Sequence, residues 1–166
     1  MPRHSFLAIF AATLLLPGLA GAAGKKAPDL KLSFHLQAEP GDRRVFKQLT
    51  AGKEVIFQKA AAISTKDIVA FRSFPADDNN SYGVVFQLDK TATNRLRTLS
   101  TAHQGKLLLA VVNGQVLDAV VIDKPVNDGL IVIWKWISLA EVKLTDQHLP
   151  RIGEDPRAWK KRIKKK

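Results

Sequence analysis

The clearest local pattern in the chain is a pair of apolar runs separated by Asn113-Gly114. Residues 106–112 and 115–123 are each long enough for a β-strand, and Asn-Gly suits the positive φ that both central residues of a type I′ turn require. The pattern therefore predicts a β-hairpin. Both alternating faces of its first run are apolar, so we expect a central strand in which Leu109 and Val111 are buried.

Other patterns predict the remaining elements. Residues 30–38 alternate between apolar and polar positions, which indicates a half-exposed strand, and further strands are expected at 55–59, 69–74, 82–88 and 130–137. Asp89 is a suitable N-cap for a helix that ends at Gly105, and Ser138 with Glu141 forms a capping box for a second helix. The order of elements predicts a single α+β domain, with a largely antiparallel sheet and two helices packed on one face.

The N-terminal residues have the pattern of a secretory signal peptide. Arg3 precedes an apolar run at 6–16, and Ala20-Gly21-Ala22 matches a small-residue cleavage site. The run is short for a membrane span, although retention as an uncleaved anchor is the alternative. Cleavage near Ala22 predicts a periplasmic or secreted protein, and the absence of cysteine is compatible with export.

Positive charge is concentrated at the C-terminus. The whole chain has a net charge of +11, and residues 151–166 hold eight basic and two acidic residues, a net charge of +6. Low apolar content predicts that residues 151–166 are a disordered basic tail. This tail either improves solubility or contacts an anionic membrane or cell-wall surface. The residues predicted for that contact are Lys160, Lys161, Arg162, Lys164, Lys165 and Lys166. Export argues against nucleic acid as the partner.

The chain carries no recognisable catalytic or metal-binding pattern. Without cysteine, the histidines at 35, 103 and 148 lack the spacing of a zinc site. Residues 77–80 (Asp-Asp-Asn-Asn) lack the ligand pattern of an EF-hand and predict a hairpin loop instead. No nucleophile elbow or glycine-rich phosphate loop is present. We therefore expect a protein that is not an enzyme and binds no cofactor or metal; an enzyme built from distant residues is a further alternative.

Trp134 and Trp136 are the candidate polypeptide contacts. They lie two residues apart in a predicted strand and so project from the same face. Lys135 lies between them on the opposite face, but Ile133 and Ile137 share that face, so the pattern does not identify the solvent side. Core packing is the favoured interpretation, and an exposed aromatic strip is the alternative.

Several stretches resemble, in order, the head subdomain of the first periplasmic domain of SecD, a subunit of the bacterial Sec preprotein translocase. They are ISTKDI at 63–68, VVFQLD at 84–89, RLRTLS at 95–100, GKLLLAVVNGQV at 105–116, IDKPV at 122–126 and SLAE at 138–141. The resemblance divides the chain into a signal peptide (1–22), a linker and strand (23–54), a SecD head-like domain (55–150) and the basic tail (151–166).

The sequence departs from that family in three ways. Val120 follows Ala119 where a proline is usual, Trp134 or Trp136 stands where a glycine is usual, and the proton-coupled membrane helices of SecD are not part of the resemblance. It therefore implies a free-standing exported binding module, with a link to protein export, rather than a motor.

Such a module would contact polypeptide or an envelope component. A sheet edge could accept an extended segment by strand addition, with Trp134 and Trp136 as anchors. The alternative function is an adaptor for anionic membrane or cell-wall surfaces that acts through the basic tail.

Overall fold

The computed structural model describes residues 29–165. The predicted signal peptide at 1–22, residues 23–28 and Lys166 lie outside the described residues. Cleavage near Ala22 therefore stays a prediction, which N-terminal sequencing of exported protein would test.

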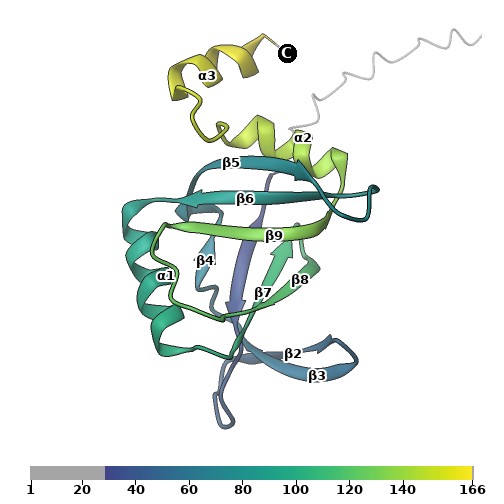
Figure 1. Ribbon diagram of the computed structural model, residues 1–166, viewed down its shortest axis with the longest axis vertical. Helices are drawn as coiled ribbons and strands as arrows, with labels where there is room; N and C mark the ends of the chain where they lie inside the picture. The colour runs from purple at the N-terminus through teal and green to yellow at the C-terminus, as the bar shows by residue number, and fades with distance from the viewer. Residues whose placement is uncertain (1–28, 166) are drawn as a thin grey trace, which may run out of the picture.

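The described strands form three antiparallel sheets (Figure 1). In the four-stranded sheet the order is β4 (Ile63–Ser64), β1 (Leu32–Leu36), β7 (Leu107–Val112) and β8 (Gln115–Val121). In the three-stranded sheet the order is β5 (Ile68–Pro75), β6 (Tyr82–Leu88) and β9 (Leu130–Ile137). The third sheet is the hairpin of β2 (Val45–Thr50) and β3 (Lys53–Gln58). The predicted α+β class with antiparallel strands is confirmed, although the strands divide among three sheets.

The main core lies between the four-stranded and three-stranded sheets. Phe34 of β1 and Phe86 of β6 are almost fully buried, and their rings meet edge to face with centroids 6.3 Å apart. Helix α1 (Lys90–Ala102) contributes Ala92 and Leu96 to the same core. Helix α2 (Leu139–His148) runs along β5, and helix α3 (Pro156–Lys164) lies beyond α2, farther from the sheets (Figure 1). A short 3₁₀ turn, η1 (Thr65–Asp67), joins β4 to β5.

The central hairpin forms as the sequence predicts. Val112 pairs with Gln115 across a two-residue turn, and Asn113 and Gly114 have φ values of 50° and 84°. β7 has a partner on each side, and Leu109 is fully buried. The prediction for Val111 is wrong in degree: this residue is half-buried, because it lies on the face of β7 opposite Leu108, Ala110 and Val112, which pack into the main core.

Gly114→Val is expected to lower the free energy of unfolding by about 1–2 kcal/mol, because a β-branched residue resists positive φ. A Cβ at this position would meet no atom within 4 Å, so backbone strain is the main cost. Gly114→Asn is the matched control, since asparagine tolerates this region, and it should cost less. Equal losses for valine and asparagine in denaturant titrations would contradict the type I′ assignment.

Both predicted helix caps are present. Asp89 Oδ1 accepts a hydrogen bond of 2.7 Å from the Ala92 N–H, and Ser138 and Glu141 form the reciprocal capping box of α2.

Ser100, fully buried on α1, accepts a 2.8 Å hydrogen bond from the Val126 N–H. This contact fixes the connection between β8 and β9 against the helix.

The β2–β3 hairpin is the main element that sequence analysis missed. The sequence predicts one strand here, at 55–59, and places residues 23–54 in a linker and one earlier strand. Ala51 and Gly52 turn the chain with φ values of 48° and 76°. Ala-Gly is a weaker turn signal than Asn-Gly, because alanine rarely adopts positive φ.

The predicted loop at 77–80 is confirmed, with Asp78 Oδ1 accepting from the Asn80 and Ser81 N–H groups.

Candidate functional site

Strands β8 and β9 each lie at the end of their sheet. β8 pairs only with β7 in the four-stranded sheet, and β9 pairs only with β6 in the three-stranded sheet, among the described strands. The other side of each strand is therefore a sheet edge. An edge presents backbone N–H and C=O groups that an additional strand can pair with.

The hydrogen-bond alternation identifies which backbone groups face these edges. Ile122 N–H donates to the Lys106 carbonyl (2.9 Å), so the alternate residue Val121 directs its backbone groups away from β7. In the same way, Leu88 N–H donates to the Gly129 carbonyl (2.9 Å). The backbone groups of Gly129 therefore face β6. Because this direction alternates along a strand, the backbone groups of Val132, three residues further on, point to the open side of β9.

β5 and β4 form the opposite edges of the two sheets, and these edges are occupied differently. Along β5, Phe71 N–H donates to the Pro150 carbonyl (3.0 Å), and Ile152 N–H donates to the Phe71 carbonyl (2.8 Å). The segment after α2 therefore bridges the middle of β5 at Phe71. β4 has two residues and leads directly into η1, so it offers little edge for pairing. Among residues 29–165, β8 and β9 are the longer edge strands of these two sheets whose outer sides carry no backbone bridge.

An apolar groove of about 560 Å³ lies between β8, the 122–128 connection and β9. Its floor includes the core residues Phe34, Leu108 and Ala110. At its rim, Val121 is 52% exposed and Trp134 is 58% exposed. Large apolar side chains left in water beside a concave apolar surface are typical of a binding site.

Trp134 is held in place by an aromatic neighbour and a glycine. Its ring packs edge-on against Phe74 of β5, with centroids 6.1 Å apart. Gly83 of β6 makes room for this pair, since a Cβ there would lie 2.1 Å from the Phe74 ring and 2.7 Å from the Trp134 carbonyl oxygen. The close approach therefore requires glycine at position 83.

The favoured core interpretation is wrong for Trp134. Ile131 and Ile133 occupy the buried face of β9, so residue 134 projects from the opposite, solvent-facing side. Trp136 belongs to β9, but its side chain lies outside what the structure describes. Val121 and Val132 were not predicted as site residues, because their importance depends on which strands lie at sheet edges.

The charged residues at the groove are of both signs. Arg72, Asp123, Lys124 and Asp128 all contribute to its lining and are exposed. Asp128 Oδ1 accepts a 3.0 Å hydrogen bond from the Leu130 N–H at the start of β9. The groove therefore has no strong preference for one sign of charge, and its apolar surface is the main feature available for recognition.

The prediction of a disordered C-terminal tail is wrong for residues 156–164, which form α3. Asp155 caps this helix, because its Oδ1 accepts from the N–H groups of Arg157 and Ala158. Pro156 occupies the first turn, where its missing N–H costs nothing. The Asp155-Pro156 pair is a local helix-start signal, and it could have identified α3 from the sequence.

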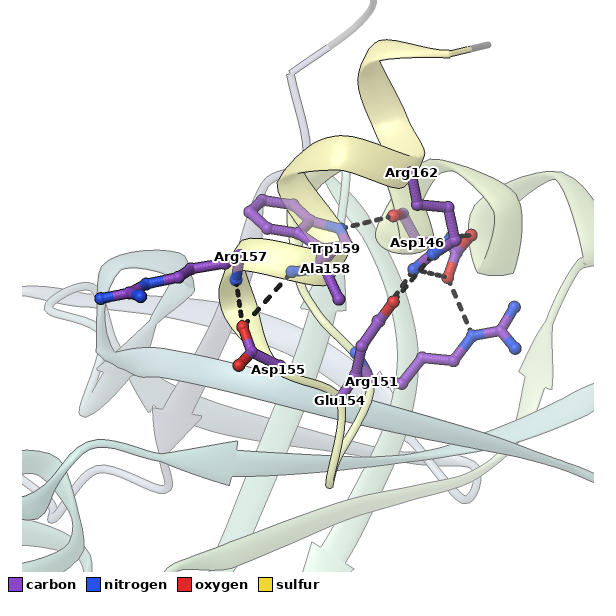
Figure 2. A network of polar contacts seen from close by, with 8 residues as sticks. All are labelled: Asp146, Arg151, Glu154, Asp155, Arg157, Ala158, Trp159 and Arg162. Atoms are coloured by element: carbon purple, nitrogen blue, oxygen red, sulfur yellow. Dashed lines mark hydrogen bonds and ion pairs between the residues drawn. The ribbon is translucent and has the colours of Figure 1, made fainter.

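A cluster around Asp146 attaches α3 to α2 (Figure 2). The Arg162 guanidinium binds both carboxylate oxygens of Asp146, and its Nε lies 2.9 Å from Glu154 Oε1. Arg151 Nε donates to Asp146 Oδ1 (3.0 Å), and Trp159 Nε1 donates to the Asp146 carbonyl (3.1 Å). Arg162 is thus engaged within the protein, which changes its predicted role from surface contact to attachment of the helix.

The cluster keeps its carboxylates ionised. Burial by itself would raise the pKa of Asp146, but hydrogen bonds from Arg162 and Arg151 outweigh burial and hold this pKa below its usual value. The hydrogen bonds from Arg162 also lower the pKa of Glu154. The remaining predicted contacts within the described residues, Lys160, Lys161, Lys164 and Lys165, are exposed.

Two general features complete the description of residues 29–165. No group of three or more histidine or acidic side chains in this part of the chain is placed to hold a metal ion. None of its helices has the length and apolar character needed to cross a membrane.

Comparison with known proteins identifies relatives of this fold. The family described as SecDF, P1 head subdomain, matches residues 43–143, a range that includes the β2–β3 hairpin. No curated protein matches the chain in sequence.

Two solved structures are similar to this one. A structure of SecDF, a membrane component that enhances protein export, aligns with a TM-score of 0.53 and 18% identity, over 80% of this chain and 69% of that chain. A crystal structure of SecDF in its super-membrane-facing form aligns with a TM-score of 0.52 and 18% identity, over 69% of this chain and 18% of that chain. At this level of identity the likeness shows the fold alone.

Proposed function

Because the chain belongs to the SecDF P1 head subdomain family, we propose that it is a non-catalytic module of protein export that binds extended polypeptide in the groove between β8 and β9. The observation that carries this proposal is the juxtaposition of two sheet edges with an exposed apolar groove. The edges offer backbone pairing to any sequence, and the groove offers burial for apolar side chains. The module acts outside the cytoplasm, in agreement with the signal-peptide pattern of residues 1–22.

Strand addition would suit a partner that is still unfolded. A polypeptide in transit has free backbone N–H and C=O groups, and these can pair with the outward backbone groups of Val121 or Val132. Trp134 and Val121 at the rim would pack against the apolar side chains of the bound segment. Large aromatic residues contribute a disproportionate share of binding energy at such positions.

We expect the groove to bind a fluorescent ten-residue peptide of alternating valine and threonine, and Val121→Pro to weaken this binding at least ten-fold. Proline removes an outward-facing N–H, and it is tolerated at a strand edge because that N–H makes no ladder hydrogen bond. Val121→Thr is the matched control, since it keeps the N–H and the β-branched shape. Fluorescence anisotropy measures the affinity, and circular dichroism checks the fold.

A peptide N-methylated at alternate residues provides the decisive comparison, because it lacks the backbone donors needed for pairing. Equal affinity for the methylated and unmethylated peptides would rule out strand addition. Trp134→Ala should also reduce affinity without loss of folding, since its side chain is largely exposed. Undiminished binding by this variant would exclude Trp134 as an anchor.

A further inference from the structure

Helix α3 has two chemically different faces. Trp159, Arg162 and Ile163 are half-buried and form the side that faces the protein. The opposite side carries residues spaced at i, i+3, i+4, i+7 and i+8, which share one helix face. These residues, here called the outer face of α3, are Arg157, Lys160, Lys161, Lys164 and Lys165, and all are exposed. The outer face is therefore a continuous basic surface.

The orientation of this basic surface is set by the Asp146 cluster. Arg162 is bound by Asp146 and Glu154, and Trp159 donates to the backbone of α2, so the inner side of the helix is attached. Arg157 extends away from the cluster (Figure 2). Because the anchoring residues lie on one side, the cations of the outer face point away from the body of the protein.

Within residues 29–165, the outer face forms no ion pair that would explain its composition. Residues 156–165 include no acidic side chain, and the nearby acids Glu154 and Asp155 are used to bind Arg162 and to cap the helix. Like charges at i, i+3 and i, i+4 destabilise an isolated helix. The helix dipole favours positive charge in the last turn, which holds Lys161 and Lys164, and so offsets part of this repulsion. The charges of the outer face are left available for an external anionic contact.

We propose that the outer face of α3 binds the surface of an anionic phospholipid bilayer. The face is convex, and its side chains diverge, so they suit an extended layer of anionic headgroups better than a single small anion, which requires converging donors. The predicted export of the chain separates it from nucleic acid. α3 also lies at the opposite end of the molecule from the β2–β3 hairpin, where it is accessible to a planar surface (Figure 1).

This inference is independent of peptide binding in the β8–β9 groove, because the two surfaces share no residue. A basic helix face gives reversible association that depends on lipid charge and weakens as salt screens the attraction. The bound protein would be held beside the membrane while its groove remains available to polypeptide.

Sedimentation with vesicles tests the proposal. The probe is vesicles of 30% phosphatidylglycerol in phosphatidylcholine, compared with vesicles of phosphatidylcholine alone. We expect partitioning onto the anionic vesicles only, falling steeply as salt rises. The variant K160Q/K161Q/K164Q/K165Q should lose roughly a hundred-fold or more in partitioning, because each basic residue near an anionic surface contributes about a five-fold factor.

The matched control is K53Q/K59Q/K66Q/K90Q, which removes the same charge from four exposed lysines elsewhere. It should retain most of the binding. Every variant shares the same N-terminus, so any contribution from residues 1–28 is equal in all of them. Equal losses in the two variants would overturn the proposal, since net charge alone would then explain the association. Equal binding to neutral vesicles, or binding of soluble polyphosphate without binding of anionic vesicles, would also overturn it.

Discussion

Replacing Leu109 with alanine is expected to lower the free energy of unfolding by about 2–5 kcal/mol, the range for removing a buried leucine side chain. Leu109 is fully buried in β7, which lies between β1 and β8. Its neighbour across the strand pair is His35 of β1, and the His35 ring packs against Phe46 of the β2–β3 hairpin with centroids 5.2 Å apart. A cavity at this position is enclosed by several elements and cannot easily collapse.

Urea titration followed by circular dichroism measures this effect. Leu49→Ala makes the same chemical change at a side chain that is 68% exposed, so it should alter stability by no more than about 0.5 kcal/mol. If the two alanine variants were equally stable, Leu109 could not be part of a packed central strand.

Replacing Asp146 with alanine is expected to cost about 2 kcal/mol and to release α3 from α2. Asp146 is buried and accepts hydrogen bonds from two arginines, and its loss would leave Arg162 with Glu154 as its remaining carboxylate partner in the cluster. Thermal unfolding measures the loss, and limited proteolysis after residue 150 reports release of the helix. Asp77→Ala, in the exposed loop before β6, is the control and should have little effect.

The same carboxylate predicts how stability depends on pH. The folded-state pKa of Asp146 lies below its usual value near 3.8, so the unfolded chain binds this proton more tightly than the folded protein. The stabilisation is therefore complete above about pH 5 and declines as the pH falls below 4. Asp146→Ala should show a smaller loss of stability between pH 6 and pH 3 than the unchanged protein. An identical pH dependence in both proteins would show that the Asp146 contacts do not stabilise the fold.

Local chemistry explains the predictions that succeeded. Asn113-Gly114 specifies its turn through the φ values that these two residues tolerate, and Asp89 and Ser138 specify helix starts through hydrogen bonds to residues within three positions. The same kind of signal, Asp155-Pro156, precedes α3, but the low apolar content of residues 151–166 favours a prediction of disorder. α3 bears few apolar residues because Arg162 and Trp159 attach it largely through polar contacts.

The sequence by itself determined the α+β class, the central hairpin and the first two helices, because these depend on periodicity and on interactions between near neighbours. Only the tertiary structure decided that β8 and β9 border one groove, that Trp134 faces solvent, and that Arg162 pairs with Asp146. Each of these depends on where distant segments lie: Trp134 belongs to a strand with apolar residues on both faces, so its exposure follows from which face packs on the opposing sheet. The sequence shows that α3 is basic. Which arginine is attached to the protein, and which basic residues face outward, depends on the position of α2.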